Sequence, residues 1–170
     1  MTIGTILRAG VVAKEEGITE MRRGLAAWET TGAELGRSCH LALLAEVYGK
    51  WGQNKEGLDI IEGALAAIDM TKERWYEAEI CRLRGELILA LSQENQFEAE
   101  TCFRRAIDIA RQQGARSWEL RAVMSLSRLL QRQGKKEEAL KVLSTIYSQF
   151  TEGFDTRDLK DARALIDELS

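Results

Sequence analysis

The sequence contains no proline in its 170 residues. Proline interrupts helices, so its absence is compatible with long unbroken helices. Stretches rich in Val, Ile, Thr and Tyr that alternate with a period of two, which would indicate strands, are also missing. Long stretches are instead dominated by Ala, Leu, Glu, Arg and Gln, and most of these residue types have high helix propensity. We therefore predict an all-α protein.

An excess of positive charge is absent too. Lysine and arginine total 24 against 27 aspartates and glutamates, a formal charge of -3, which gives no overall attraction to nucleic acid or anionic lipid. No stretch reaches the roughly 18 consecutive apolar residues of a membrane span, and the first residues do not form a basic region followed by an apolar run. We expect a cytoplasmic protein with no nucleic-acid or membrane partner.

Residues typical of catalytic and metal sites are scarce. His40 is the single histidine, and the motifs CxxC, HExxH and GxxxxGK[ST] do not occur. The three cysteines, Cys39, Cys81 and Cys102, are odd in number and lie within apolar helical patterns, as expected for reduced core thiols. We predict no enzymatic activity, no cofactor and no metal. For His40 we favour a structural or solvated side chain over a ligand or catalytic role.

An internal repeat with a period of about 40 residues dominates the chain. The repeating pattern is a small residue followed four positions later by a large apolar residue. The small residues are Gly17, Gly57, Ala99 and Ala139, which are almost evenly spaced, with a slightly longer interval between the second and the third. Each of the last three small residues follows another amphipathic helical pattern and a short turn region. This arrangement predicts tandem hairpins of two antiparallel helices.

Small residues also occupy fixed positions in the first helix of each predicted hairpin, at Ala45, Gly85 and Ser127. Small side chains at matched positions of two helices allow their backbones to approach closely. The apolar stripe of the same helices is predicted to form the core; it consists of Leu41, Leu44, Tyr48, Cys81, Ile88, Val123, Leu126 and Leu130.

The repeat pattern predicts one domain that spans residues 1–170. Its repeats are expected at 34–71, 72–114 and 115–150, after an irregular leading half-repeat at 1–33. Residues 3–31 are compatible either with a half-repeat that bends sharply or with one continuous helix whose apolar face pairs with another molecule. Residues 155–170 are predicted to form a capping helix with Asp155 or Thr156 at its N-cap.

These residues resemble the tetratricopeptide repeat (TPR) family. The pattern that carries the resemblance is a small residue between Leu44 and Tyr48, followed by Gly57-x3-Ile61-x2-Ala64, and it extends over residues 17–150. The period is longer than that of the TPR motif, which is about 34 residues, and no proline closes a repeat. The resemblance implies a right-handed superhelix of antiparallel helix hairpins with a concave binding surface.

A narrower resemblance is to the C-terminal helical-repeat region of bacterial signalling ATPases, many of which carry an adenylate or guanylate cyclase domain. The segments that suggest it are RWYEAE at 74–79, RLRGEL at 82–87, SWELRA at 117–122 and FTEGFDT at 150–156. This resemblance implies a repeat module of a bacterial signalling or regulatory system. It implies no activity, because none of these segments is catalytic.

A partner is expected on the concave surface, which the first helix of each hairpin forms. Residues one step around those helices from the core stripe are predicted to face it: Leu43, Glu46, Lys50, Glu79, Arg82, Glu86, Arg121, Met124, Arg128 and Arg132. Three of the arginines are spaced at seven and four residues, which places them on nearly one helix face. This basic strip is interpreted as an acceptor for peptide carboxylates or an acidic helix, or alternatively as a solvated face.

The sequence therefore favours a non-catalytic scaffold that binds a protein or peptide, with homo-oligomer formation through the N-terminal helix as a further possibility. The alternative is a sensor that binds a peptide or small molecule in the concave groove. Four tryptophans, Trp28, Trp51, Trp75 and Trp118, are predicted near helix ends, where they would join neighbouring hairpins.

Overall fold

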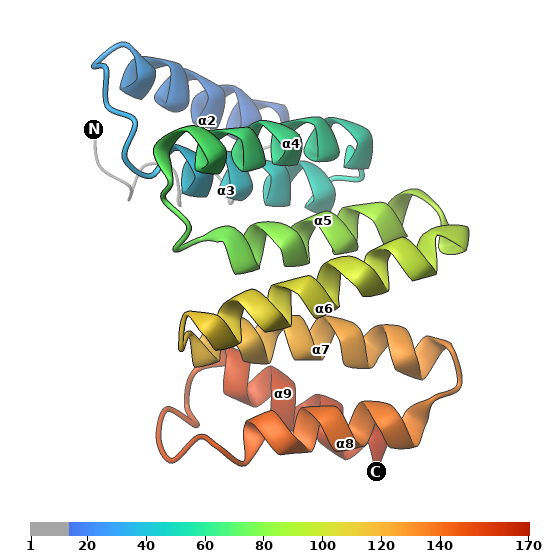
Figure 1. The fold of residues 1–170 in the computed structure, drawn as a ribbon. Helices are drawn as coiled ribbons and strands as arrows, with labels where there is room; N and C mark the ends of the chain where they lie inside the picture. The colour runs from blue at the N-terminus through green and yellow to red at the C-terminus, as the bar shows by residue number, and fades with distance from the viewer. Residues whose placement is uncertain (1–13) are drawn as a thin grey trace.

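The computed structural model describes residues 14–170. Within this range the regular secondary structure is entirely helical (Figure 1). The α-helices are α2 (Lys14–Glu29), α3 (Arg37–Lys50), α4 (Asn54–Thr71), α5 (Glu77–Leu91), α6 (Gln96–Gln112), α7 (Arg116–Arg132), α8 (Lys136–Tyr147) and α9 (Arg157–Leu169), and the short 3-10 helix η2 spans Gln93–Asn95.

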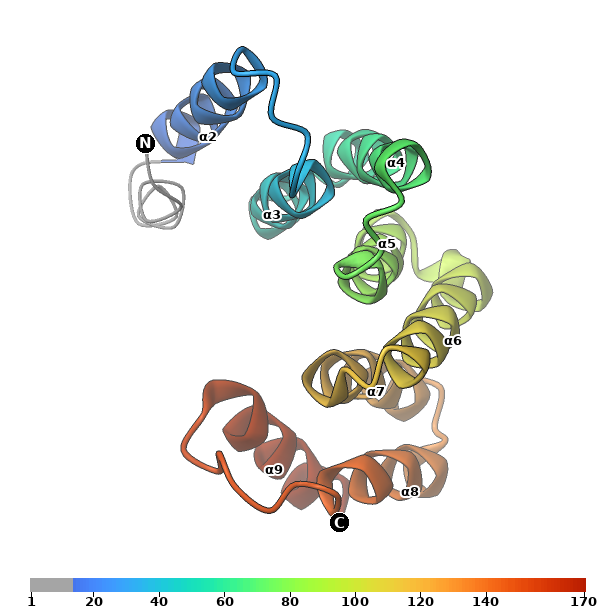
Figure 2. The same cartoon turned by 60° about the vertical axis from the view of Figure 1, so that its left-hand side comes forward.

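The helices form a curved stack of antiparallel hairpins, α3–α4, α5–α6 and α7–α8. Figure 2 shows α3, α5, α7 and α9 along the inner side of the curve and α4, α6 and α8 along the outer side. Each inner helix contacts the next, α3 with α5, α5 with α7 and α7 with α9. The prediction of an all-α superhelix of helix hairpins that ends in a capping helix is therefore confirmed.

Small residues allow the two helices of a hairpin to approach closely, as the sequence predicts. A Cβ atom added to Gly57 would lie 3.3 Å from the carbonyl oxygen of Ala45, and one added to Gly85 would lie 3.1 Å from that of Ala99. The Gly85 position is the more crowded, because the same Cβ would lie 2.5 Å from Cε1 of the fully buried Phe103 ring. Glycine at position 85 is therefore required by packing.

We expect the substitution Gly85→Ala to destabilise the fold by about 1–3 kcal/mol, because the new methyl group overpacks a buried ring. The matched control is Gly63→Ala in α4, where an added Cβ would meet only Leu41 Cδ1, at 3.9 Å. That substitution should stabilise the protein by about 0.5–1 kcal/mol through helix propensity. Urea denaturation of both variants measures the difference, and equal effects would contradict this account of Gly85.

In the third hairpin a serine occupies the position where the two helix backbones approach each other. Ser127 is fully buried, and its hydroxyl donates a hydrogen bond to the carbonyl oxygen of Ala139 at 3.2 Å. The turns of the first and third hairpins contain Gly52 and Gly134, with φ angles of 76° and 78°, in the left-handed region that glycine adopts without steric cost. The middle hairpin, whose turn region is slightly longer, uses η2 at its turn instead.

Among the described α-helices, α2 and α3 make the least extensive contact of any consecutive pair. Met21 on α2 packs with Leu44 and Tyr48 on α3 in a small apolar cluster, and the guanidinium of Arg22 lies 5.4 Å from the centre of the Tyr48 ring. Of the segment 3–31, whose shape the sequence leaves open, α2 covers Lys14–Glu29. The part before residue 14 lies outside the described residues.

The C-terminal end is covered by α9. The apolar face of this helix is buried at Leu159, Ala162, Leu165 and Leu169, in the same core cluster as α5, α6, α7 and α8. Thr156 occupies the N-cap position, one of the two predicted, but its hydroxyl donates to the carbonyl oxygen of Gly153 and does not cap the helix.

Candidate functional site: the concave face

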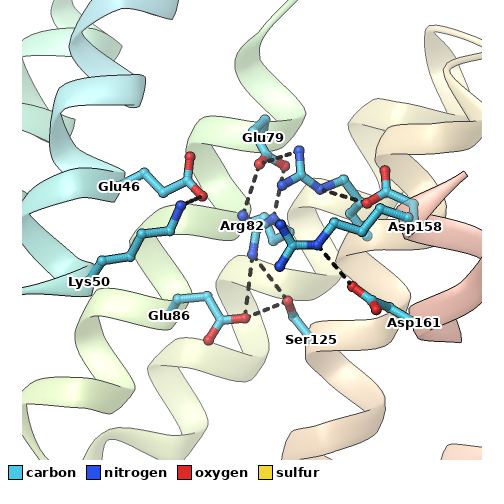
Figure 3. A network of polar contacts seen from close by, with 10 residues as sticks. Glu46, Lys50, Glu79, Arg82, Glu86, Ser125, Asp158 and Asp161 are labelled. Atoms are coloured by element: carbon cyan, nitrogen blue, oxygen red, sulfur yellow. Dashed lines mark hydrogen bonds and ion pairs between the residues drawn. The ribbon is translucent and has the colours of Figure 1, made fainter. Parts of the chain in front are cut away.

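A buried carboxylate organises the inner face of the stack (Figure 3). The Glu79 side chain on α5 is 1% exposed. It accepts two hydrogen bonds from the Arg82 guanidinium, from Nε to Oε2 and from Nη2 to Oε1, both at 2.8 Å. Burial lowers the pKa of Arg82. Its hydrogen bonds with Glu79 and the negative charge of that carboxylate raise the pKa by more, so it lies above its usual value. The two parallel hydrogen bonds fix both side chains on this face.

The same network joins three consecutive inner helices. Arg121 on α7 pairs with Oε1 of Glu79 at 2.9 Å and with Asp158 on α9 at 3.8 Å. The hydroxyl of Ser125, also on α7, donates to Oε1 of Glu86 on α5 at 2.6 Å. These contacts link α5, α7 and α9, so the network fixes how successive hairpins sit relative to one another.

A hollow with a volume of about 280 Å³ lies beside this network, between α3 and α5. The exposed Ala90 contributes apolar surface to it, beside Leu83 and Leu87, which line it but are only 5% and 3% exposed. The charged side chains around it come from both helices; they are Glu46, Lys50, Arg82 and Glu86. Lys50 pairs with Glu46 at 2.8 Å and remains 66% exposed.

Two solved structures have a similar fold. One contains the nearly identical TPR-like repeats assigned to a kinesin light chain of Podosopora anserina, with a TM-score of 0.64 and 18% sequence identity over 92% of this chain and 77% of that one. The other is a single-substitution variant of the same repeats, with a TM-score of 0.66, 18% identity and coverages of 92% and 76%. The chain has a TPR-like repeat fold. No family model matches the sequence, and no curated protein matches it significantly.

This TPR-like array brings most of the predicted groove residues to the inner face. Glu46, Lys50, Arg82 and Glu86 surround the hollow. Leu43 does not line it; it is half-buried and packs against the apolar cluster between α2 and α3. Arg128 and Arg132 are exposed on α7. Because residues 121, 125, 128 and 132 recur at intervals of three and four, these two arginines share a face of α7 with Arg121 and Ser125.

Two of the predicted residues are not available to a partner. Met124 is 5% exposed and packs in the hydrophobic core, so the expectation that it faces the groove is wrong. The reason is that α7 packs against α5 and α9 as well as against α6 and its hairpin partner α8, which buries a wider arc of the helix than one stripe. Glu79 does lie in the polar network of this face, but it is buried beneath the two arginines that it binds.

The three arginines of the predicted basic strip differ in whether they form ion pairs. Arg121 is neutralised by Glu79 and Asp158, and its guanidinium also lies 5.4 Å from the Trp118 ring centre. Arg128 and Arg132 form no ion pair with any described residue. Sequence reasoning missed Ser125 and Asp158, because a serine within a core pattern and an aspartate in the first turn of a helix both have ordinary structural explanations.

The remaining candidate residues have structural environments. His40 packs edge to face against Trp28 with ring centres 5.0 Å apart, and burial lowers its pKa. Trp118 contacts Tyr76 of the preceding hairpin at 5.1 Å, the joining role predicted for the tryptophans. Cys39, Cys81 and Cys102 are unpaired thiols, and burial raises the pKa of Cys81 to about 11. A thiol with such a pKa is a poor nucleophile at neutral pH.

A second hollow of about 330 Å³ lies on the outer side, between α6 and α8. Two of the cations around it already have partners: Arg104 pairs with Glu100 at 2.8 Å and Arg111 pairs with Glu119 at 2.7 Å. Across residues 14–170, no set of three or more His, Cys, Asp or Glu side chains could hold a metal ion, and no helix is long and apolar enough to cross a membrane.

Proposed function

We propose that the protein is a non-catalytic scaffold that binds a protein partner on the concave face formed by α3, α5, α7 and α9. Arrays of this kind present extended concave surfaces for binding. The observation that carries the proposal is the combination, on this one face, of a hollow with apolar surface and the exposed arginines Arg128 and Arg132, which pair with no described residue.

Site-specific photo-crosslinking in the cells that express the protein tests this proposal. A benzophenone amino acid replaces Asp161, an exposed residue on the inner helix α9, in one variant and Lys55, an exposed residue on the outer helix α4, in a matched control. Both substitutions leave Arg128 and Arg132 in place. We expect one discrete crosslinked protein with the variant at 161 and a much weaker signal at 55. Equal crosslinking at both positions, or none at 161, would contradict the proposal.

The wider context proposed is a repeat module of a bacterial signalling or regulatory system in the cytoplasm. Its support is the resemblance of residues 74–79, 82–87, 117–122 and 150–156 to the repeat region of bacterial signalling ATPases. Association of two chains through the N-terminal helix belongs to the same proposal, and it is supported by the apolar residues of segment 3–31. The net charge of -3 supports partners other than nucleic acid.

A sensor that binds a peptide or small molecule is the second candidate, and the hollow between α3 and α5 is the observation that favours it. Its volume of about 280 Å³ lies near the lower limit of about 300 Å³ for small-molecule sites. A thermal-shift screen against metabolites distinguishes the two functions, since a ligand that binds only the folded state raises the melting temperature. Stabilisation by a metabolite that the variant Ala90→Phe abolishes would favour the sensor.

A further inference from the structure

Large apolar side chains are exposed together at one edge of the array. The α2–α3 and α4–α5 loops both lie along this edge (Figure 1), and the backbone N–H of Gly36 donates to Oε2 of Glu73 across the two loops at 2.8 Å. Close to these two residues along the chain are Leu35, Met70 and Trp75, which are 79%, 70% and 51% exposed. We call these three residues the edge patch. Single exposed apolar residues are common on protein surfaces, whereas a group of them indicates an interaction site.

The ring of Trp75 is held in place by the array. It packs edge to face against Tyr76 with ring centres 5.1 Å apart, and the buried Tyr76 packs in the same way against Trp118 at 5.1 Å. A side chain whose position is fixed before binding loses little conformational entropy when a partner covers it. Tryptophan is also among the residues that contribute most to binding at protein interfaces. Trp75 is therefore suited to anchor a protein partner.

Lys72, between Met70 and Trp75, has a backbone conformation that is unfavourable for lysine. It forms the C-cap of α4 with φ 61° and ψ 15°, and it is the only residue other than glycine with a positive φ among residues 14–170. The turn after α6 places Gly114 in the same conformation, with φ 63°. Glycine adopts this conformation without steric cost, whereas a lysine does not. Folding alone therefore favours glycine at position 72, and the lysine charge is the feature that remains to be explained.

The exposed charges beside the edge patch have both signs. Lys72 is exposed, as are Glu34 and Asp69, and none of these three side chains forms an ion pair with any residue that the structure describes. In a contact between two identical surfaces related by a two-fold axis, each residue pair occurs twice. Lys72 of each copy can then pair with Glu34 or Asp69 of the other while the apolar side chains cover one another. A partner with charge of one sign would leave like charges facing each other.

We propose that the edge patch joins two copies of this chain in a two-fold dimer. The contact goes beyond the proposed function, because it uses loop residues and the end of the outer helix α4 in place of the inner helices. The concave face therefore takes no part in it. The edge patch is also separate from the N-terminal helix, through which association was proposed above.

Sedimentation of the full chain over a range of concentrations tests the apolar part of this contact. We expect a monomer–dimer equilibrium, and the double variant L35S/M70S should raise its dissociation constant at least tenfold, because the apolar surface buried in the dimer is lost. The matched control is L91S/F97S, which changes two exposed apolar residues near the turn between α5 and α6. It should alter the dissociation constant less than twofold, and thermal melting confirms that both variants fold.

Charge reversal tests the pairing between copies. K72E places a negative charge opposite Glu34 and Asp69 of the second copy, and E34K/D69K places positive charges opposite its Lys72, so each variant alone should dimerise at least tenfold more weakly. A mixture of the two variants should form heterodimers, because every contact then joins opposite charges. Native mass spectrometry with one variant isotopically labelled measures them. Lys72→Gly should weaken the dimer without lowering the melting temperature, since it relieves the steric cost.

The outcomes keep this inference separate from the proposed function. A chain that stays monomeric up to its solubility limit would overturn the inference, and so would a dimer that L35S/M70S leaves unchanged or variants that form no heterodimers. In each of these cases the crosslink at position 161 still decides whether the concave face binds a partner. A crosslink at 161 that is lost while the dimer persists would overturn the proposed function alone.

Discussion

Replacing Phe103 with alanine is expected to lower the free energy of unfolding by about 3–5 kcal/mol, the usual cost of removing a large buried aromatic side chain. Phe103 is fully buried in the cluster that joins α5, α6, α7, α8 and α9. Because domains of this size are stable by about 5–15 kcal/mol in total, the variant should lose a large part of its stability. Urea denaturation followed by circular dichroism measures the loss.

The matched control is Phe97→Ala on the same helix, where the ring is 84% exposed and the change should stay within about 0.5 kcal/mol. A second check uses the crowded contact between Phe103 and Gly85. Once the ring is removed, Gly85→Ala should destabilise the protein less, because only the 3.1 Å approach to the Ala99 carbonyl oxygen remains, so the two substitutions should be non-additive. A loss under about 1 kcal/mol for Phe103→Ala would refute this view of the core.

Substituting Glu79 with glutamine is the second large effect, with an expected loss of about 3–5 kcal/mol. The carboxylate is 1% exposed and binds Arg82, which is 11% exposed, as well as Arg121. Removing the carboxylate leaves the buried Arg82 guanidinium with only its longer contact to Glu86, at 3.4 Å, and a poorly compensated buried charge accounts for the magnitude. The measurement is again chemical denaturation at neutral pH.

Glu20→Gln is the control for the loss of a carboxylate. Its pair with Arg23, at 3.3 Å, has side chains 49% and 73% exposed, so its removal should have little effect. The double variant E79Q/R82M removes the buried charge from both sides and should recover part of the stability lost in E79Q. If E79Q and E20Q proved equally mild, the network would contribute no more than an exposed ion pair.

Much of the fold could be predicted because packing imposes simple patterns on the sequence. The small residues at 45, 57, 85 and 99 recur with the repeat, and they occupy the positions where helix backbones meet. Helical periodicity also identified the capping helix and the inner face of each hairpin. These features depend on neighbours within one hairpin or on the next copy of the same pattern.

The details of the site depend on contacts between hairpins, which periodicity does not encode. Arg121 and Arg128 have the same chemistry and share a helix face, yet only Arg121 reaches Glu79 on α5 and Asp158 on α9. Met124 is at a position that periodicity alone assigns to the groove, but α9 and α5 flank α7 and bury it. The packing of α5, α7 and α9 together therefore determines which side chains of α7 are paired or buried and which remain exposed.

Helix α2 packs on α3 through a small apolar cluster and the contact between Trp28 and His40, and this limited packing has a consequence for how the array opens. In repeat proteins each unit is stabilised by its own folding and by its nearest neighbours, so local opening free energies differ along the chain. Helix α2, and then the hairpin α3–α4 with its own core cluster, should open and reclose many times for each global unfolding event. Helices α5 to α9, which share one core cluster and the Glu79 network, should open together. The hollow lies at the border between these regions, so a bound segment would slow amide exchange in α3 most of all.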